Sequence, residues 1–119
     1  MKIAVTTTGK ELSSPFESRF GRAPGFIIYD LESGSFEALD NSVNLNTAQG
    51  AGIQAAQNII KSGAKALISG HCGPKAFAVL SKAGVEVFSA TAETVENAIE
   101  KYKKGELAKL DSADVDEHW

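Results

Sequence analysis

One short stretch, residues 65–75, limits the fold of this 119-residue chain more than any other. Ala66-Leu67-Ile68 is an uninterrupted apolar run, typical of a strand that is buried on both faces. Gly70 and Gly73 then allow a tight turn, and Pro74 suits the first position of a helix, where its missing N–H has no partner to lose. The stretch therefore predicts a strand, a sharp turn and a helix, as in α/β folds.

The turn of this unit carries two residues of metal-ligating type, His71 and the only cysteine, Cys72. The N-terminus of the helix that follows favours a thiolate or another anion, because its N–H groups and its dipole are positive there. We therefore expect Cys72, aided by His71, to bind metal and to react rapidly with thiol reagents. The alternative is an inert cysteine that fits a cramped turn, beside a histidine that makes only local hydrogen bonds.

Charge and composition exclude several classes of function. A net charge of −3 argues against a general nucleic-acid binder, and no apolar run approaches membrane-spanning length. Only three apolar residues follow Lys2, so no signal peptide is expected. A single cysteine forms no internal disulfide, which favours a reducing cytoplasm. It also cannot hold an iron–sulfur cluster alone, since such clusters usually take about four protein thiolates.

The first third of the chain predicts three strands and one long irregular segment. The strands are expected at residues 2–6, 26–30 and 35–40, with a hairpin between the second and third. The irregular segment from Thr7 to Gly25 is too long for a simple connection, so we expect it to be mobile and to order around a ligand.

Two arginines within this irregular segment are candidates for anion contact. Phe16 and Phe20 are four residues apart and predict one helical turn anchored on the body of the protein. Arg19 and Arg22 are three apart and would then share a face. The alternative for both arginines is surface solubility.

The apolar period predicts three helices. The first covers residues 49–62, with Asn46 or Thr47 as its N-cap, and the second begins at Pro74 and ends at Gly84. A strand at 85–88 follows, and then a third helix with Thr91 as its N-cap that ends at Gly105.

Gly50 and Gly52, near the start of the first helix, look like a fragment of a phosphate-binding loop but lack the spacing of a nucleotide motif. We interpret them as allowing close packing or close approach of a ligand to the backbone.

These elements predict a single domain over residues 1–107 and an acidic, mobile tail over 108–119, which includes His118. Right-handed crossovers give a five-stranded mixed sheet of order 3-2-1-4-5, in which only the second strand is antiparallel. The first and central strands are then neighbours at a topological switch point, where open α/β sheets bind ligands. Three segments, 7–25, 41–52 and 70–73, are expected to open on one crevice there.

Enzymatic alternatives lack their residues. A two-metal nuclease of this topology needs carboxylates on the first and central strands, and KIAVTTT and ALISG contain none. A cysteine hydrolase needs a base positioned to reach the thiolate, and His71 is adjacent in sequence, where side chains often point apart. We expect no catalysis.

Four stretches together resemble the dinitrogenase iron–molybdenum cofactor biosynthesis family (NifX/NifB C-terminal type). They are Phe16-Glu17-Ser18-Arg19-Phe20-Gly21-Arg22-Ala23-Pro24, Gly50-Ala51-Gly52-Ile53-Gln54-Ala55-Ala56-Gln57, Ile68-Ser69-Gly70 with Gly73-Pro74-Lys75-Ala76, and Thr94-Val95-Glu96-Asn97-Ala98-Ile99. The resemblance runs to about Leu107. It implies a ribonuclease H-like α/β fold and non-catalytic binding of a metal–sulfide cluster or its precursor.

The leading hypothesis is a cytoplasmic carrier or scaffold for an iron–sulfur or molybdenum-containing metal–sulfide cluster, which it receives from donor proteins or passes to acceptors. Metal ligation is assigned to His71 and Cys72, and the remaining cluster contacts are assigned to Arg19, Arg22, Gly50, Gly52, Gly70 and Gly73. The alternatives are a binding module for a small anionic metabolite or nucleotide in the same crevice, and a protein-interaction domain without a ligand.

Overall fold

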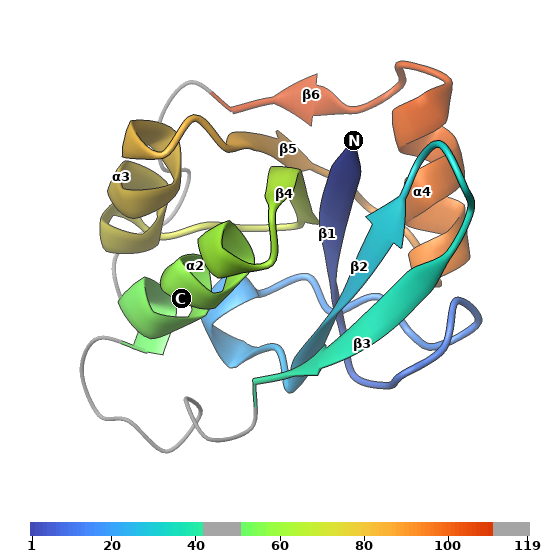
Figure 1. Ribbon diagram of the computed structural model, residues 1–119, viewed down its shortest axis with the longest axis horizontal. Coiled ribbons are helices and arrows are strands. Elements are labelled where there is room, and N and C mark those ends of the chain that lie inside the picture. The colour runs from blue at the N-terminus through green and yellow to red at the C-terminus, as the bar shows by residue number, and fades with distance from the viewer. Residues whose placement is uncertain (42–50, 111–119) are drawn as a thin grey trace.

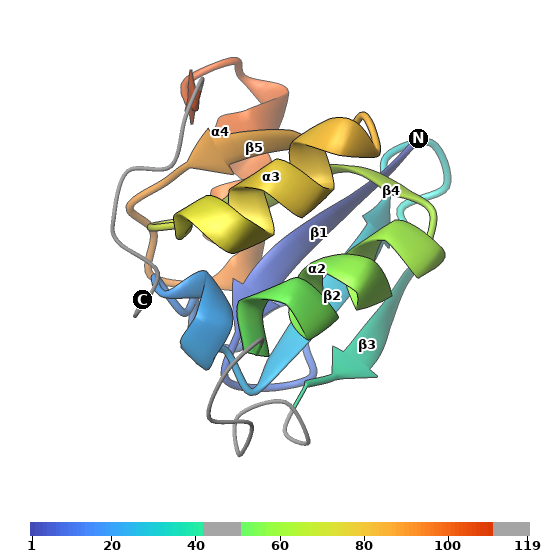
Figure 2. The same cartoon turned by 90° about the vertical axis from the view of Figure 1, so that its left-hand side faces the viewer.

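The structure is a computed structural model that describes residues 1–41 and 51–110. They form three layers, with one sheet between helices on its two faces (Figures 1 and 2). The strands are β1 (Lys2–Thr7), β2 (Gly25–Asp30), β3 (Phe36–Asp40), β4 (Ala64–Ser69), β5 (Glu86–Ser89) and β6 (Ala108–Lys109). The helices are η1 (Phe20–Arg22), a 3₁₀ turn, and α2 (Ala51–Lys61), α3 (Pro74–Lys82) and α4 (Val95–Lys103). Helices α2 and α3 cover one face of the sheet and α4 covers the other.

The strand order confirms the predicted topology for the first five strands. The sheet runs β3-β2-β1-β4-β5-β6. Strands β1, β4 and β5 are parallel, whereas β2 is antiparallel to both of its neighbours. The α/β class and the switch point between β1 and β4 therefore follow the prediction.

A sixth strand corrects the prediction of five strands and of a tail that begins at residue 108. Strand β6 pairs antiparallel with β5, and the Leu110 N–H donates to the Val87 carbonyl oxygen at 2.8 Å. Leu110 also packs against the core cluster on the side of the sheet that α2 and α3 cover. A two-residue strand is too short to produce a periodic sequence pattern, so it was missed. Residues 111–119, including His118, lie outside the described residues.

Coverage of both sheet faces explains why the central strands are continuously apolar. In β1, Ile3 and Val5 pack toward α4, while Ala4 packs toward α2 and α3. In β4, Leu67 packs toward α2 and α3, and Ile68 toward α4. Between the exposed Lys2 and Lys65 at their amino ends and the buried hydroxyl residues at their carboxyl ends, both strands are therefore apolar on both faces.

The three long helices lie where the apolar period placed them, but α4 begins later than predicted. Its N-cap is Thr94 rather than Thr91, and the Thr94 hydroxyl accepts a hydrogen bond from the Asn97 N–H at 3.1 Å. The preceding residues are extended because the Glu93 carbonyl accepts from the Phe16 N–H and Thr94 pairs with Pro15. The proposed N-caps Asn46 and Thr47 of α2 fall outside the described residues.

The described α-helices have 9 to 11 residues, and over residues 1–41 and 51–110 no helix is long and apolar enough to cross a membrane. At the end of α4, Tyr102 packs edge-on against Phe88, with the ring centroids 5.1 Å apart. Partial burial, and secondarily the charge of Glu86, raises the pKa of the Tyr102 hydroxyl.

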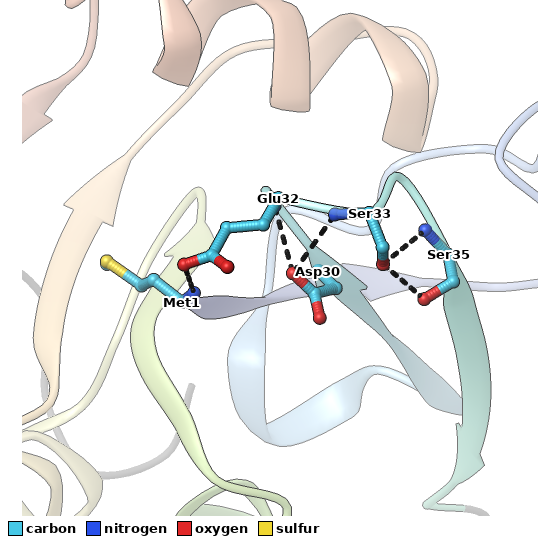
Figure 3. Close-up of polar contacts among 5 residues, drawn as sticks. All are labelled: Met1, Asp30, Glu32, Ser33 and Ser35. Carbon is cyan, nitrogen blue, oxygen red and sulfur yellow. Dashed lines mark hydrogen bonds and ion pairs between the residues drawn. The ribbon is translucent and has the colours of Figure 1, made fainter.

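The predicted hairpin between β2 and β3 is closed by the carboxylate of Asp30 (Figure 3). Its Oδ1 accepts hydrogen bonds from the Glu32 N–H at 2.9 Å and the Ser33 N–H at 3.4 Å. The Glu32 N–H is the main cause of a pKa of Asp30 below its ordinary value. The N-terminal amine lies 3.4 Å from a Glu32 carboxylate oxygen and ties the start of β1 to this turn.

Candidate functional site

The three parallel strands end at one edge of the sheet, which we call the carboxyl edge. Strands β1, β4 and β5 reach it at Thr7, Ser69 and Ser89. The chain between β1 and β2 leaves and rejoins the sheet here, because Thr7 pairs with Gly25. Figure 2 shows η1 at this edge, beside the starts of α2 and α3. The segments predicted to converge do so, except residues 42–50, which lie outside the described part of the chain.

The arginine segment, residues 15–24, runs directly along the turn that follows β4. The His71 N–H donates to the Ser18 carbonyl at 2.7 Å, and the Phe20 N–H donates to the His71 carbonyl at 3.1 Å. Arg19 thus lies opposite His71 in a parallel bridge. A Cβ atom on Gly70 would lie 2.7 Å from the Ser18 Cβ, so glycine permits this close approach.

Further backbone hydrogen bonds anchor the long connection on its other side. The Glu17 N–H donates to the Thr6 carbonyl at 3.1 Å, and the Val95 N–H at the start of α4 donates to the Ser14 carbonyl at 3.0 Å. These bonds anchor the segment without a ligand, which argues against the expected mobility between Thr7 and Gly25, and ordering around a ligand stays a prediction.

The predicted helical turn between Phe16 and Phe20 is wrong. Phe16 is extended and pairs with Thr7, on the α4 side of the sheet, whereas Phe20 is buried on the α2 and α3 side. The helical turn lies instead at Phe20–Arg22, as a 3₁₀ helix. The reason is that the carbonyls of residues 15, 17 and 18 bind strand residues and the 70–73 turn, and so are not available to an α-helix.

Both arginines lie at the ends of η1 and are exposed. Arg19 is its N-cap and Arg22 its last residue. Arg19 has an extended backbone and precedes the 3₁₀ helix, so the side-chain spacing of that helix does not apply to it, and the shared face of Arg19 and Arg22 stays a prediction. The Arg19 side chain is 50% exposed and lies 3.5 Å from a Glu17 carboxylate oxygen, an exposed ion pair that contributes little to stability. Lys75 in the first turn of α3 is also exposed.

The two predicted metal ligands differ in access. His71 is partly buried, with its backbone paired to the arginine segment. Cys72 is 0% exposed and belongs to the core between the sheet, α2 and α3. Its Sγ lies 3.7 Å from the Gly73 carbonyl oxygen. The expectation of rapid thiol labelling is therefore wrong for this conformation, because the turn directs Cys72 inward against the core.

The predicted contact glycines have distinct structural roles. Gly73 is the buried N-cap of α3 and has an extended backbone conformation. A Cβ on Gly52 would meet the Ala76 Cβ at 3.4 Å, so this glycine lies at the packing contact between α2 and α3. Gly50 lies outside the described residues.

Sequence reasoning missed four buried polar residues around the arginine segment: Thr6, Thr7, Asn41 and Ser69. We call them the anchor residues. A signal for two of them is present in the sequence, since the apolar run of β1 passes into consecutive threonines where the strand reaches the carboxyl edge. Nothing comparable marks Asn41 or Ser69.

The donor set of the site does not resemble a cage for a single metal ion. Over residues 1–41 and 51–110, no group of three or more His, Cys, Asp or Glu side chains is placed to hold a metal ion. A structural zinc site takes about four such ligands. What the edge offers instead is two exposed guanidinium groups, a partly buried imidazole and a buried thiol.

Comparison with known proteins identifies relatives over nearly the whole chain. The model of the family described as "Dinitrogenase iron-molybdenum cofactor" matches residues 1–105. An uncharacterized protein of Methanocaldococcus jannaschii is 31% identical over 114 residues, which cover 93% of this chain and 92% of that protein.

Two solved structures combine similar sequence with the same fold. The apo form of the orange protein of Desulfovibrio gigas is 37% identical, with a TM-score of 0.92 and 96% of both chains covered. A putative NifB protein of Thermotoga, solved by NMR, is 37% identical, with a TM-score of 0.85 and 96% and 97% of the two chains covered. The family match and these relatives show that this chain belongs to the dinitrogenase iron–molybdenum cofactor family.

Proposed function

We propose that this protein binds and carries, without catalysis, a metal–sulfide cluster or its precursor at the carboxyl edge of the sheet. Family membership over residues 1–105 is the observation that carries the proposal. The similar Desulfovibrio protein is described as an apo form, a term for a protein without the group that it binds. The cargo is of the iron–sulfur or molybdenum-containing class, and donor and acceptor proteins in the cytoplasm are its proposed partners. The ribonuclease H-like fold remains part of this proposal.

The donor set supports a cargo that brings its own ligands. A metal–sulfide cluster carries sulfide around its metal atoms, so it needs few protein ligands, in contrast to a bare ion. The sparse donor set of the described residues fits such a cargo. A carrier also has to release what it binds, which a complete cage of protein ligands would oppose.

Charge at the carboxyl edge supports an anionic cargo. Arg19 and Arg22 are exposed at the two ends of η1, and neither α2 nor α3 has an acidic residue in its first turn. The N-terminal ends of both helices add partial positive charge. An anion at this edge is therefore attracted locally, although the whole chain has a net charge of −3.

His71 and Cys72 remain the proposed protein ligands, with different requirements. The partly buried His71 needs no large rearrangement to meet a cluster. Cys72 has to leave the core, so its ligation would require the turn at 70–73 to open. Gly50, Gly52, Gly70 and Gly73 are proposed to let the cargo approach the backbone.

The test uses protein expressed and purified without oxygen, followed by metal analysis and visible absorption. The metal-free protein is then titrated with two probes, tetrathiomolybdate and ferrous iron with sulfide, and bound colour is separated by gel filtration. We expect at least one probe to bind. The double variant Arg19→Gln with Arg22→Gln should bind it at least tenfold more weakly at low salt, with a smaller difference at high salt, where screening is strong.

The matched control is Lys61→Gln with Lys82→Gln, which removes the same charge from the far ends of α2 and α3. It should bind the probe as the wild type does. If the wild type carries no metal and binds neither probe, the proposal is wrong. Binding of phosphate or a nucleotide under the same conditions would then favour the anionic-metabolite alternative.

A further inference from the structure

The four anchor residues all make the same kind of contact, a hydrogen bond to the backbone of the arginine segment. They are Thr6, Thr7, Asn41 and Ser69, and together they make up the buried polar side chains of the described part of the chain. Each is at most 1% exposed. Each donates a side-chain hydrogen bond to a backbone carbonyl of the arginine segment. All four side chains thus reach residues 15–24, while the Thr6 and Ser69 hydroxyls also have a second carbonyl within range, that of Ile68 at 3.5 Å and that of His71 at 3.4 Å.

The three anchor residues on the parallel strands donate to carbonyls that come before Arg19 in the sequence. The Thr6 hydroxyl donates to the Glu17 carbonyl, and the Ser69 hydroxyl to the Ser18 carbonyl at 3.3 Å. The Thr7 hydroxyl donates to the Pro15 carbonyl at 2.7 Å. These strand residues therefore fix the backbone that leads directly into Arg19.

The remaining anchor residue, Asn41, binds carbonyls that come after Arg22 in the sequence. The Asn41 side-chain amide donates to the Ala23 carbonyl at 2.8 Å, and the Asn41 N–H donates to the Pro24 carbonyl at 2.8 Å. The stretch from Arg19 to Arg22 is thus fastened on both sides while the two side chains stay exposed.

Burying hydroxyl and amide groups is costly for a core, because they lose hydration and regain only the hydrogen bonds that they form. An apolar residue at Thr6 would avoid that cost but would also take from the Glu17 carbonyl the hydroxyl that it binds. Holding a binding segment in its bound conformation, in contrast, improves affinity by removing the entropy cost of ordering it. A preformed binding segment is therefore one gain that offsets the cost of burying these groups.

We infer that Thr6, Thr7, Asn41 and Ser69 are positioning residues, which hold Arg19 and Arg22 preformed for an anionic metal–sulfide cargo. This inference rests on the proposed function of the carboxyl edge. The anchor residues do not touch the cargo, since they are buried. Their effect on cargo affinity passes through the geometry of the arginine segment.

The test compares Thr6→Val, which keeps the side-chain shape and removes the hydroxyl, with Thr6→Ser, which keeps the hydroxyl. Binding of tetrathiomolybdate is measured by visible absorption, and amide exchange is measured at Glu17, Phe20 and His71. We expect Thr6→Val to raise the dissociation constant about tenfold and to speed exchange at these amides, because the segment opens more often. Thr6→Ser should stay within about twofold of the wild type.

Two further variants separate positioning from general stability. Ser62→Ala removes a hydroxyl that donates to the Ile59 carbonyl at the opposite edge of the sheet, and it should leave probe affinity unchanged. In an Arg19→Gln background, Thr6→Val should weaken binding by less than about threefold, since part of what it positions is gone. Ser69→Ala replaces Thr6→Val if the valine variant does not fold, with the same expected direction.

The outcomes distinguish the two proposals. If the wild type binds the probe and Thr6→Val binds it equally well, the anchor residues do not position the arginines. An affinity loss of the same size with and without Arg19 would also overturn the inference, because the effect would then be general. If the wild type binds no metal–sulfide probe, the proposed function fails and takes this inference with it.

Discussion

Gly70 is the position at which a single methyl group should disturb the carboxyl edge most directly. A Cβ at this residue would lie 2.7 Å from the Ser18 Cβ, 2.7 Å from the Ser18 carbonyl oxygen and 2.9 Å from the Ser18 Cα. Two of these atoms are backbone, so they cannot yield by a change of rotamer. The substitution Gly70→Ala therefore has to displace the arginine segment from β4.

The size of this displacement determines how much unfolding free energy Gly70→Ala should lose. Ordinary contact begins near 3.4 Å, so Ser18 has to move by about 0.7 Å. The same movement lengthens the His71 N–H bond to the Ser18 carbonyl from 2.7 Å to about 3.4 Å, beyond good geometry. Overpacking costs about 1–3 kcal/mol and one weakened hydrogen bond about 1 kcal/mol, offset by about 0.5–1 kcal/mol from a stiffer unfolded chain. The free energy of unfolding should fall by about 1–3.5 kcal/mol.

Urea denaturation of the metal-free protein measures this loss, and Gly52→Ala is its matched control. A Cβ on Gly52 meets the Ala76 Cβ at 3.4 Å without overlap, and alanine favours the helix. That variant should be as stable as the wild type or up to about 1 kcal/mol more stable. A Gly70→Ala variant within about 0.5 kcal/mol of the wild type, with the Ser18 contacts retained by NMR, would refute the reasoning.

Three further predictions concern other parts of the chain. Asp30→Ala should lower the urea midpoint at pH 7, and the difference should shrink as pH falls below about 4, because a carboxyl with a lowered pKa stabilises the fold only while ionised. Cys72 in the native protein should react with a thiol reagent at least tenfold more slowly than in urea, and fast native labelling would contradict its burial. Thr94→Ala should cost about 1 kcal/mol of unfolding free energy as the N-cap of α4 is lost, whereas Thr91→Ala should change it by less than about 0.5 kcal/mol.

Topology was predictable from this sequence because the strands and helices have strong, separate periods. Ala66-Leu67-Ile68 between Gly63 and Gly70 specifies a buried central strand, and handedness then leaves few arrangements for its neighbours. Short elements carry no such signal. The pairing of Ala108 with Ser89 depends on where the end of α4 brings the chain, which local sequence does not encode.

The carboxyl edge was predictable in its location but not in its contacts. Its place follows from the strand order, which brings the arginine segment beside the turn after β4. The inward orientation of Cys72 depends on the packing of α3, and the conformation of Phe16 depends on pairing with Thr7. Both result from contacts between residues far apart in the sequence, where periodicity gives no information.

The carboxyl edge combines a backbone that is held by hydrogen bonds with charged side chains that are exposed. The anchor residues and the His71 pairing hold the backbone of the arginine segment, yet the Arg19 side chain is half exposed and, within the described part of the chain, is paired with Glu17 at 3.5 Å. A preformed backbone favours capture, whereas long exposed side chains and a sparse set of metal ligands in the described part of the edge favour release. In the proposed carrier function, a largely electrostatic attraction would let an acceptor protein with a competing charge or a true ligand set remove the cargo without unfolding the site.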